Sequence, residues 1–364
     1  MTADEDATSS ARSTVRRVAP GVAFLAVLAG VARAAAGVVP VASELVVAVA
    51  LGLVVANTVG VPESLAAGVE THTRWLELGI VLMGARVSLS TLLSTGPTLA
   101  VLVVGVVLLT LVLVEALANG VFGVRGKLGS LLAAGASVCG VSAAVGVAGS
   151  IGANEDDLAY AAGTILLFDV VTLFAYPVVG SALGLTERVF GVWAGLTMFS
   201  TGPVTAAGFA FGDVAGRWAT VTKLTRNLLL GVLVVGYSLW YANADTAGSE
   251  RDDDTETGRD DATTSSSSSF AGSLRAIASS FPTFVLGFFA VVVLTSSAVV
   301  PDAATASMER AYQGLFLVAF AGLGLSVDVD DLRSTGGAPI ALVLTALLAT
   351  SAVALVAVQT LLGP

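Results

Sequence analysis

Long apolar runs alternate with short polar breaks along most of the chain, and this pattern predicts a bundle of membrane-spanning helices. A helix needs about 20 mostly apolar residues to cross the hydrocarbon core of a bilayer, which is about 30 Å thick. Eleven runs meet this requirement, separated by prolines, glycines and short charged loops. They cover residues 19–38, 41–60, 74–93, 97–118, 128–151, 158–184, 189–212, 217–241, 274–299, 309–327 and 338–361. The predicted fold class is therefore an all-α integral membrane protein with about 11 transmembrane helices.

The composition agrees with a membrane protein. Of the 364 residues, 55% are hydrophobic and 12% are charged, whereas about a quarter of an ordinary soluble domain is charged. The net charge is −10, and Lys127 and Lys223 are the two lysines. Acidic, lysine-poor segments keep protein surfaces soluble in concentrated salt, so we expect a halophilic source, although one acidic segment supplies much of the excess charge.

The distribution of Lys and Arg predicts the orientation. Positively charged residues favour cytoplasmic loops, and a cytoplasmic N-terminus places eleven of them inside and four outside. We therefore expect a multi-pass plasma-membrane protein whose N-terminus is cytoplasmic and whose C-terminus lies outside.

Two polar segments set the domain boundaries. Residues 1–18 are expected to form a disordered cytoplasmic tail. Residues 244–272 are acidic and rich in Ser and Thr, which is typical of a disordered linker. This linker would be cytoplasmic and would join a transmembrane core of spans 1–8, residues 19–243, to spans 9–11, residues 273–364. A tether is favoured over a partner-binding role.

Two pairs of segments resemble each other within the chain. Gly84–Gly96 (GARVSLSTLLSTG) and Gly324–Gly336 (GLSVDVDDLRSTG) share Gly, Val, Leu and Ser-Thr-Gly at equal offsets. Seven spans separate them, so they would have opposite orientations, as inverted repeats of secondary transporters do. The second pair, Cys139–Gly152 and Ser200–Gly212, lies two spans apart and would therefore be parallel.

Two spans carry helix-breaking residues near their middle. In span 5, Gly140 lies between Ser137 and Ser142, and in span 7, Gly202 and Pro203 follow Ser200 and Thr201. Proline removes a backbone donor and breaks or kinks a helix. Such breaks aim backbone groups at a ligand in transporters, although small residues also serve close helix packing. Both interpretations stay open.

Charged residues inside the apolar runs are the strongest functional signal. Asp169 lies among apolar residues in span 6, where a carboxylate costs at least about 2.5 kcal/mol. Lys223, Arg226 and Asn227 share one face of span 8, and Arg226 lies at a depth similar to that of Asp169, whereas Lys223 is shallower. Asp169 would couple an ion or proton, or would form a structural pair with Arg226. Arg86, Glu115 and Asn57 lie nearer the span ends and are weaker candidates.

Three segments carry a resemblance to a known family. GASVCGVSAAVGV, KLTRNLLL and GIVLMGARVSL resemble signature segments of a family of conserved hypothetical membrane proteins described as sulfate exporters. The resemblance covers roughly residues 45–355, apart from the acidic linker. It implies a polytopic plasma-membrane transporter with crossed, broken helices, similar in fold to bile acid–sodium symporters and cation–proton antiporters.

The chain departs from this family at one place. Members typically carry His-Asp-Thr where this chain has Phe199, Ser200 and Thr201, and a small residue where it has Asp169. The hypothesis is that the coupling carboxylate has moved from span 7 to span 6.

The sequence thus predicts a secondary transporter that moves a small anion, with sulfate as the candidate, by alternating access. Lys223, Arg226 and Asn227 would bind the anion together with Ser137, Ser142, Ser200 and Thr201. Two alternatives stay open, a sodium–proton antiporter in which Asp169 binds the cation and a non-transporting scaffold or sensor. The expected partners are the anion, a sodium ion or proton, and the bilayer, and a homo-oligomer stays open.

Other classes of function have little support in the sequence. One cysteine, Cys139, and one histidine, His72, exclude a metal site built from several such ligands. No nucleophile–base arrangement or phosphate-binding loop is recognisable, so we expect neither an enzyme nor a cofactor. No basic stretch interleaved with aromatic residues suggests nucleic-acid binding.

Overall fold

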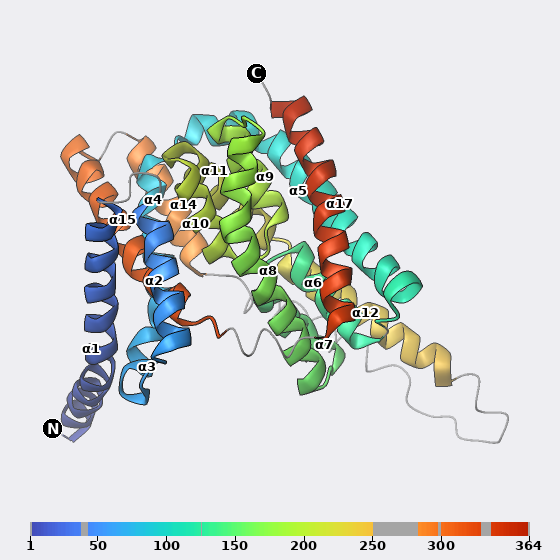
Figure 1. Cartoon of the computed structure of the whole chain (residues 1–364), viewed down its shortest axis with the longest axis horizontal. Coiled ribbons are helices and arrows are strands. Elements are labelled where there is room, and N and C mark those ends of the chain that lie inside the picture. The colour runs from blue at the N-terminus through green and yellow to red at the C-terminus, as the bar shows by residue number, and fades with distance from the viewer. Residues whose placement is uncertain are drawn as a thin grey trace.

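The structure is a computed structural model that describes residues 2–37, 43–124, 126–249, 283–297, 300–328 and 336–362. Every regular element in these ranges is a helix (Figure 1). Five helical stretches among the described residues are long and apolar enough to cross a membrane. They lie in α1 (Thr2–Ala36), α5 (Leu89–Leu117) with the π-helical turn η2 (Ala118–Phe122), α8 (Glu155–Ala182), α11 (Asp213–Asn227) with α12 (Leu230–Ser249), and α17 (Gly337–Leu362). The chain is therefore an all-helical, multi-pass membrane protein.

The remaining helices outside the central region are shorter or more polar. They are α2 (Glu44–Thr58), α3 (Glu63–Val69), α4 (His72–Met83) with the 3-10 turn η1 (Gly84–Arg86), α14 (Thr283–Ser296) and α15 (Asp302–Leu325). In Figure 1, α1, α2, α3 and α15 lie on one side of the molecule, and α5, α12 and α17 lie on the other.

The predicted span over residues 128–151 does not cross the molecule as one helix. It consists of α6 (Lys127–Ser137) and α7 (Val141–Ile151), joined by a turn at residues 138–140. The Lys127 ammonium at the start of α6 donates a hydrogen bond of 2.7 Å to the carbonyl of Gly152, directly after α7. The beginning and the end of the segment are therefore neighbours, so α6 and α7 form a re-entrant hairpin, called the first hairpin below.

The predicted span over residues 189–212 folds back in the same way. Its arms are α9 (Glu187–Thr197) and α10 (Thr201–Phe211). Phe190, near the start of α9, stacks on Phe211 at the end of α10 with ring centroids 3.9 Å apart. The Glu187 carboxylate accepts the N–H groups of Val214 and Ala215, which follow α10. These contacts define the second hairpin.

The break in the second hairpin differs from the predicted one. The turn lies at residues 198–200, whereas Gly202 and Pro203 are inside the first turn of α10. A proline fits there because the first N–H groups of a helix have no intrahelical partner in any case. Pro203 therefore lies in the first turn of the second arm and does not interrupt a spanning helix. In the first hairpin, Gly140 lies between the two arms as the N-cap of α7.

The arms of both hairpins are short. Each of the four arms has 11 residues, which gives about 16 Å at 1.5 Å per residue. This is about half of the 30 Å hydrocarbon core. Each arm is therefore too short to cross the hydrocarbon core by itself.

The two hairpins belong to an inverted repeat. The arms of the second hairpin begin 60 residues after those of the first, at 187 against 127 and at 201 against 141. The long helix α8 separates them, so the first hairpin begins and ends beside the start of α8 and the second begins beside its end. The second pair of similar segments, predicted to be parallel, is therefore inverted in the structure, because each segment folds back on itself.

The first pair of similar segments is also inverted in the structure, as predicted. It lies at the ends of α4 and α15, which pack side by side in opposite directions. His72 lies against Gly322, Gly79 against Phe316, and Arg86 pairs with Glu309 at 3.4 Å. Residues 329–335 of the second segment lie outside the described residues.

A wider two-fold pattern follows from the packing of these helices. The first segment of the first similar pair leads into α5, which packs on α6, the first arm of the first hairpin. The second segment leads into α17, which packs on α9, the first arm of the second hairpin. In the same way, α14 packs on α4 and α2 packs on α15. The two hairpins are thus held by equivalent frames.

Two predicted boundaries move. Residues 2–18, predicted as a disordered tail, belong to α1. No glycine or proline occurs between Thr2 and Ala19, and Asp4, Glu5 and Asp6 favour a helix N-terminus. At the other boundary, α12 continues to Ser249. The rest of the predicted linker, within residues 250–282, lies outside the described residues.

Candidate functional site

The tips of the two hairpins meet at Gly140 and Ser200. A Cβ atom on Gly140 would lie 2.1 Å from the Ser200 Oγ, closer than real contacts allow. The backbone of Gly140 also has φ +71°, which side-chain-bearing residues rarely adopt. The backbone conformation thus favours glycine at this position, and a larger residue would also require the Ser200 hydroxyl to move.

Lys223 and Arg226 of α11 lie behind this contact and are fully buried. The Lys223 ammonium donates to the carbonyls of Val138, at 2.6 Å, and Met198, at 3.2 Å. Both carbonyls belong to hairpin turns.

The Arg226 guanidinium is bound in the same way. Its Nε donates to the Ser137 carbonyl at 2.5 Å, one terminal nitrogen donates to Met198 at 2.8 Å, and the other donates to Ala136. Every acceptor of the two cations is thus a backbone carbonyl at the end of α6 or α9.

This arrangement has a clear electrostatic cause. The last carbonyls of a helix have no intrahelical partner and form the negative end of its dipole. Two such ends, from α6 and α9, converge on the two cations, so the burial of positive charge is compensated without an acidic partner. Lys223 and Arg226 therefore join the two hairpins to each other through α11. The two side chains carry eight N–H donors and make five hydrogen bonds to the described residues.

Asp169 lies on the other side of the second hairpin's tip and is 2% exposed. Its Oδ1 accepts the N–H of Ser200 at 2.9 Å, at the positive end of α10. It makes no ion pair with Lys223 or Arg226, so the structural pair considered from the sequence does not form in this structure. The Oδ2 atom is buried and has no hydrogen-bond partner among the described residues.

Of the other predicted site residues, Asn227 and Ser137 contact the hairpin tips or the cations, and Ser142 does not. Asn227 donates to the Thr201 hydroxyl at 3.2 Å, and its own carbonyl oxygen is buried without a partner. The Ser137 hydroxyl donates back to Ala134, so this residue meets Arg226 through its carbonyl only. Ser142 is exposed on α7 and has no hydrogen bond to Lys223 or Arg226. The structure thus assembles the predicted set apart from Ser142.

A small cavity of about 70 Å³ adjoins Asp169. Its polar side chains are Asp169, Ser200 and Ser326, and the rest of the lining is apolar, contributed mainly by α2, α8 and α15. The cavity gives Asp169 room for water or a small ion.

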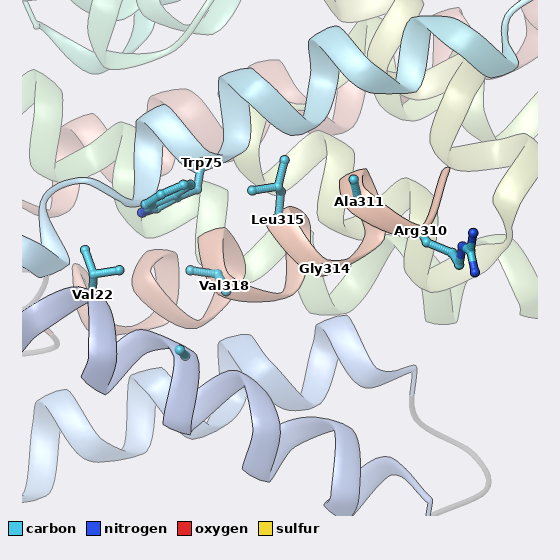
Figure 2. A pocket seen from close by; sticks show the side chains of 8 residues that line it. Val22, Trp75, Arg310, Ala311, Gly314, Leu315 and Val318 are labelled. Atoms are coloured by element: carbon cyan, nitrogen blue, oxygen red, sulfur yellow. The ribbon is translucent and has the colours of Figure 1, made fainter. Parts of the chain in front are cut away.

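A larger groove of about 420 Å³ lies elsewhere, between α1, α4 and α15 (Figure 2). Trp75 lies toward one end and Arg310 at the other, with Leu315 and Val318 along the floor. No residue of either hairpin lines it. The charged cluster at the tips, and not this groove, is therefore the candidate site.

The weaker candidates have structural partners. Arg86 pairs with Glu309, and the Asn57 amide donates to the carbonyls of Leu53 and Val327. Glu115 accepts hydrogen bonds from Ser130 and Tyr237, which fixes the first hairpin to α5 and α12.

Sequence reasoning missed the carbonyls that hold the two cations, because a backbone acceptor has no sequence signature. The re-entrant hairpins themselves left two signals in the sequence: the equal lengths of the segments on either side of Gly140, and the offset of 60 residues between the two hairpins.

Comparison with known proteins places the chain among membrane proteins. Residues 20–343 match a family model described as conserved hypothetical protein 698. A UPF0324 membrane protein of Nitratidesulfovibrio vulgaris is 32% identical over 280 residues, which is 77% of this chain and 73% of the relative. A UPF0324 membrane protein of Bradyrhizobium diazoefficiens is 30% identical over 340 residues, which is 90% of this chain and 89% of the relative. No solved structure matches the chain.

Proposed function

The chain belongs to the conserved hypothetical protein 698 family of membrane proteins, and we propose that it is a secondary transporter that moves a small anion by alternating access. The observation that carries the proposal is the meeting of two re-entrant hairpins, from opposite faces, at a buried charged cluster. A site of this kind can be reached from either face by moving one hairpin or the frame around it. Interrupted helices with their ends at mid-membrane are typical of secondary transporters.

The charge of the site favours an anion. With Lys223 and Arg226 protonated and Asp169 ionised, the cluster carries one net positive charge. The N-termini of α7 and α10 point their positive ends at the same tips, and neither carries a side-chain cap. The planar guanidinium of Arg226 suits an oxyanion, so sulfate is the first anion to test.

The position of Asp169 fits its proposed role in coupling. Its carboxylate contacts the backbone of residue 200, where members of the resembled family carry the Asp of His-Asp-Thr. A carboxylate supplied by α8 thus reaches the place of the missing one.

A cation–proton antiporter is the second candidate, and the unpartnered Oδ2 of Asp169 favours it. In that case Lys223 and Arg226 would only hold the hairpins together. A scaffold or sensor role has no supporting contact among the described residues.

The proposal places the protein in the plasma membrane with its N-terminus in the cytoplasm. Folding the two hairpins back moves Arg188 to the outer side and leaves the excess of Lys and Arg inside. In Figure 1, α1 begins at the lower edge and α17 ends at the upper edge, in keeping with termini on opposite faces. The acidic, lysine-poor composition suits a salt-rich habitat.

The test is flux of radiolabelled sulfate into proteoliposomes containing the purified protein. We expect uptake above that of empty liposomes, and its loss in a Lys223→Gln, Arg226→Gln double variant. Arg217→Gln, on the same helix, is the matched control and should keep its flux. Arg226→Lys retains the charge and guards against a purely structural failure. No flux of sulfate, thiosulfate, chloride or small carboxylates by the unmodified protein would exclude the proposal.

A further inference from the structure

The hairpin ends where a transporter would hold a sodium ion are already filled. Sodium in such proteins is coordinated by carbonyls at the C-terminal ends of half-helices and by unwound backbone. Here the carbonyls of Ser137, Val138 and Met198 accept hydrogen bonds from Lys223 and Arg226. A sodium ion at this position would lose these ligands and would be repelled by two buried positive charges. The side chains of Lys223 and Arg226 thus occupy the position where a sodium ion would bind.

The remaining anionic group offers too few ligands for a metal ion. Oδ2 of Asp169 is buried without a partner, and the adjoining cavity has only two further polar side chains, Ser200 and Ser326. Hard cations such as Ca²⁺ and Mg²⁺ are held by several oxygen ligands at once, and we expect the same of sodium, whereas a proton needs a single base. The cavity can hold the water that would deliver one.

The groups around Asp169 determine what protonation does. Lys223 and Arg226 act on it electrostatically from α11, and Cys139 lies near them at the tip of the first hairpin. The faces of α2 and α15 toward the cavity are apolar apart from Ser326. Protonation of Asp169 therefore raises the net charge of the cluster from one positive charge to two, which strengthens the binding of an anion. By linkage, the anion strengthens the binding of the proton equally.

We propose that the coupling ion is a proton carried on Asp169 Oδ2, that sodium has no site, and that the proton and the anion move in the same direction. This inference rests on the proposed transport function. The proton binds from the water on one face and is released to the water on the other, so Asp169 returns to its ionised state in each cycle.

The first experiment measures sulfate accumulation in proteoliposomes with the membrane potential clamped at zero. An outside-acid gradient of one pH unit should drive accumulation up to about tenfold for one proton per anion. Replacing choline by sodium outside should change nothing. Asp169→Asn should lose the response to pH, while Asp156→Asn, an exposed acid on the same helix, should keep it. Accumulation driven by sodium, or by an outside-alkaline gradient, would overturn the inference.

The second experiment does not depend on transport. Infrared difference spectra of the purified protein should show a pH-dependent C=O band of a protonated carboxylic acid, which Asp169→Asn removes and Asp156→Asn retains. The band of the unmodified protein should be the same in sodium chloride and choline chloride. A band that sodium abolishes would overturn the inference, even if Asp169→Asn fails to fold. An absence of any flux, by contrast, would count against the transport function alone.

Discussion

Arg226 holds the two hairpin tips together, so replacing it by methionine should destabilise the whole protein. Three of its nitrogens donate to the carbonyls of Ala136, Ser137 and Met198, and the side chain is fully buried. Bonds from a charged donor contribute about 1.5–3 kcal/mol each, while several kcal/mol are recovered when a charge is no longer buried. The carbonyls of Ala136 and Ser137 would be left buried without this donor, at about 1–3 kcal/mol each, so we expect a net loss of a few kcal/mol.

Thermal unfolding in detergent, followed by the fluorescence of the four tryptophans, measures this loss. A net loss of that size should lower the unfolding midpoint by about 5 °C or more. Arg226→Lys keeps the charge but cannot reach all three carbonyls, so its loss should be smaller. Arg217→Met, nine residues earlier on α11, is the matched control. Arg226→Met unfolding at the same temperature as Arg217→Met would refute the reasoning.

Three further predictions concern the hairpins. Gly140→Ala should cost about 1–3 kcal/mol because of the positive φ and the contact with Ser200; Gly149→Ala, on an open face of α7, should be neutral or stabilising in the same unfolding assay. Alkylation of Cys139, the single cysteine, should slow in the presence of sulfate, and an unchanged rate would place the anion elsewhere. Glu115→Ala leaves the hydroxyls of Ser130, on the first hairpin, and Tyr237, on α12, without their acceptor and should cost about 1–3 kcal/mol; a midpoint equal to that of the unmodified protein would show that Glu115 does not hold the first hairpin.

The charged residues of the site could be predicted from the sequence, because charge inside an apolar run is rare. Asp169, Lys223 and Arg226 were found in this way, and their similar depth followed from counting residues along their helices. The partners of these residues could not be predicted. Opposite charges at equal depth suggest an ion pair, but each charged side chain can instead bind the end of a helix whose dipole has the opposite sign. The carboxylate takes the N-terminus of α10 and the cations take the C-termini of α6 and α9.

The re-entrant hairpins illustrate a second limit. A run of about 24 apolar residues with a break in the middle fits one kinked span or two arms of half the length equally well. The difference is made by contacts between residues far apart in the run, such as Phe190 with Phe211 and Lys127 with Gly152. Apolar periodicity carries no information about these contacts. The error in span count also changed the orientation of the second repeat from parallel to inverted.

The central claim is that the two hairpins enter from opposite faces, and cysteine accessibility tests it most directly. In a Cys139→Ala background, single cysteines replace Val121 and Glu155, which flank the first hairpin, and Leu183 and Asp213, which flank the second; all four positions are exposed. A membrane-impermeant thiol reagent is applied to intact cells. We expect Val121→Cys and Glu155→Cys to respond alike, and Leu183→Cys and Asp213→Cys to respond alike and opposite to the first pair. Opposite responses within either pair would mean that the segment crosses the membrane, and would contradict the account.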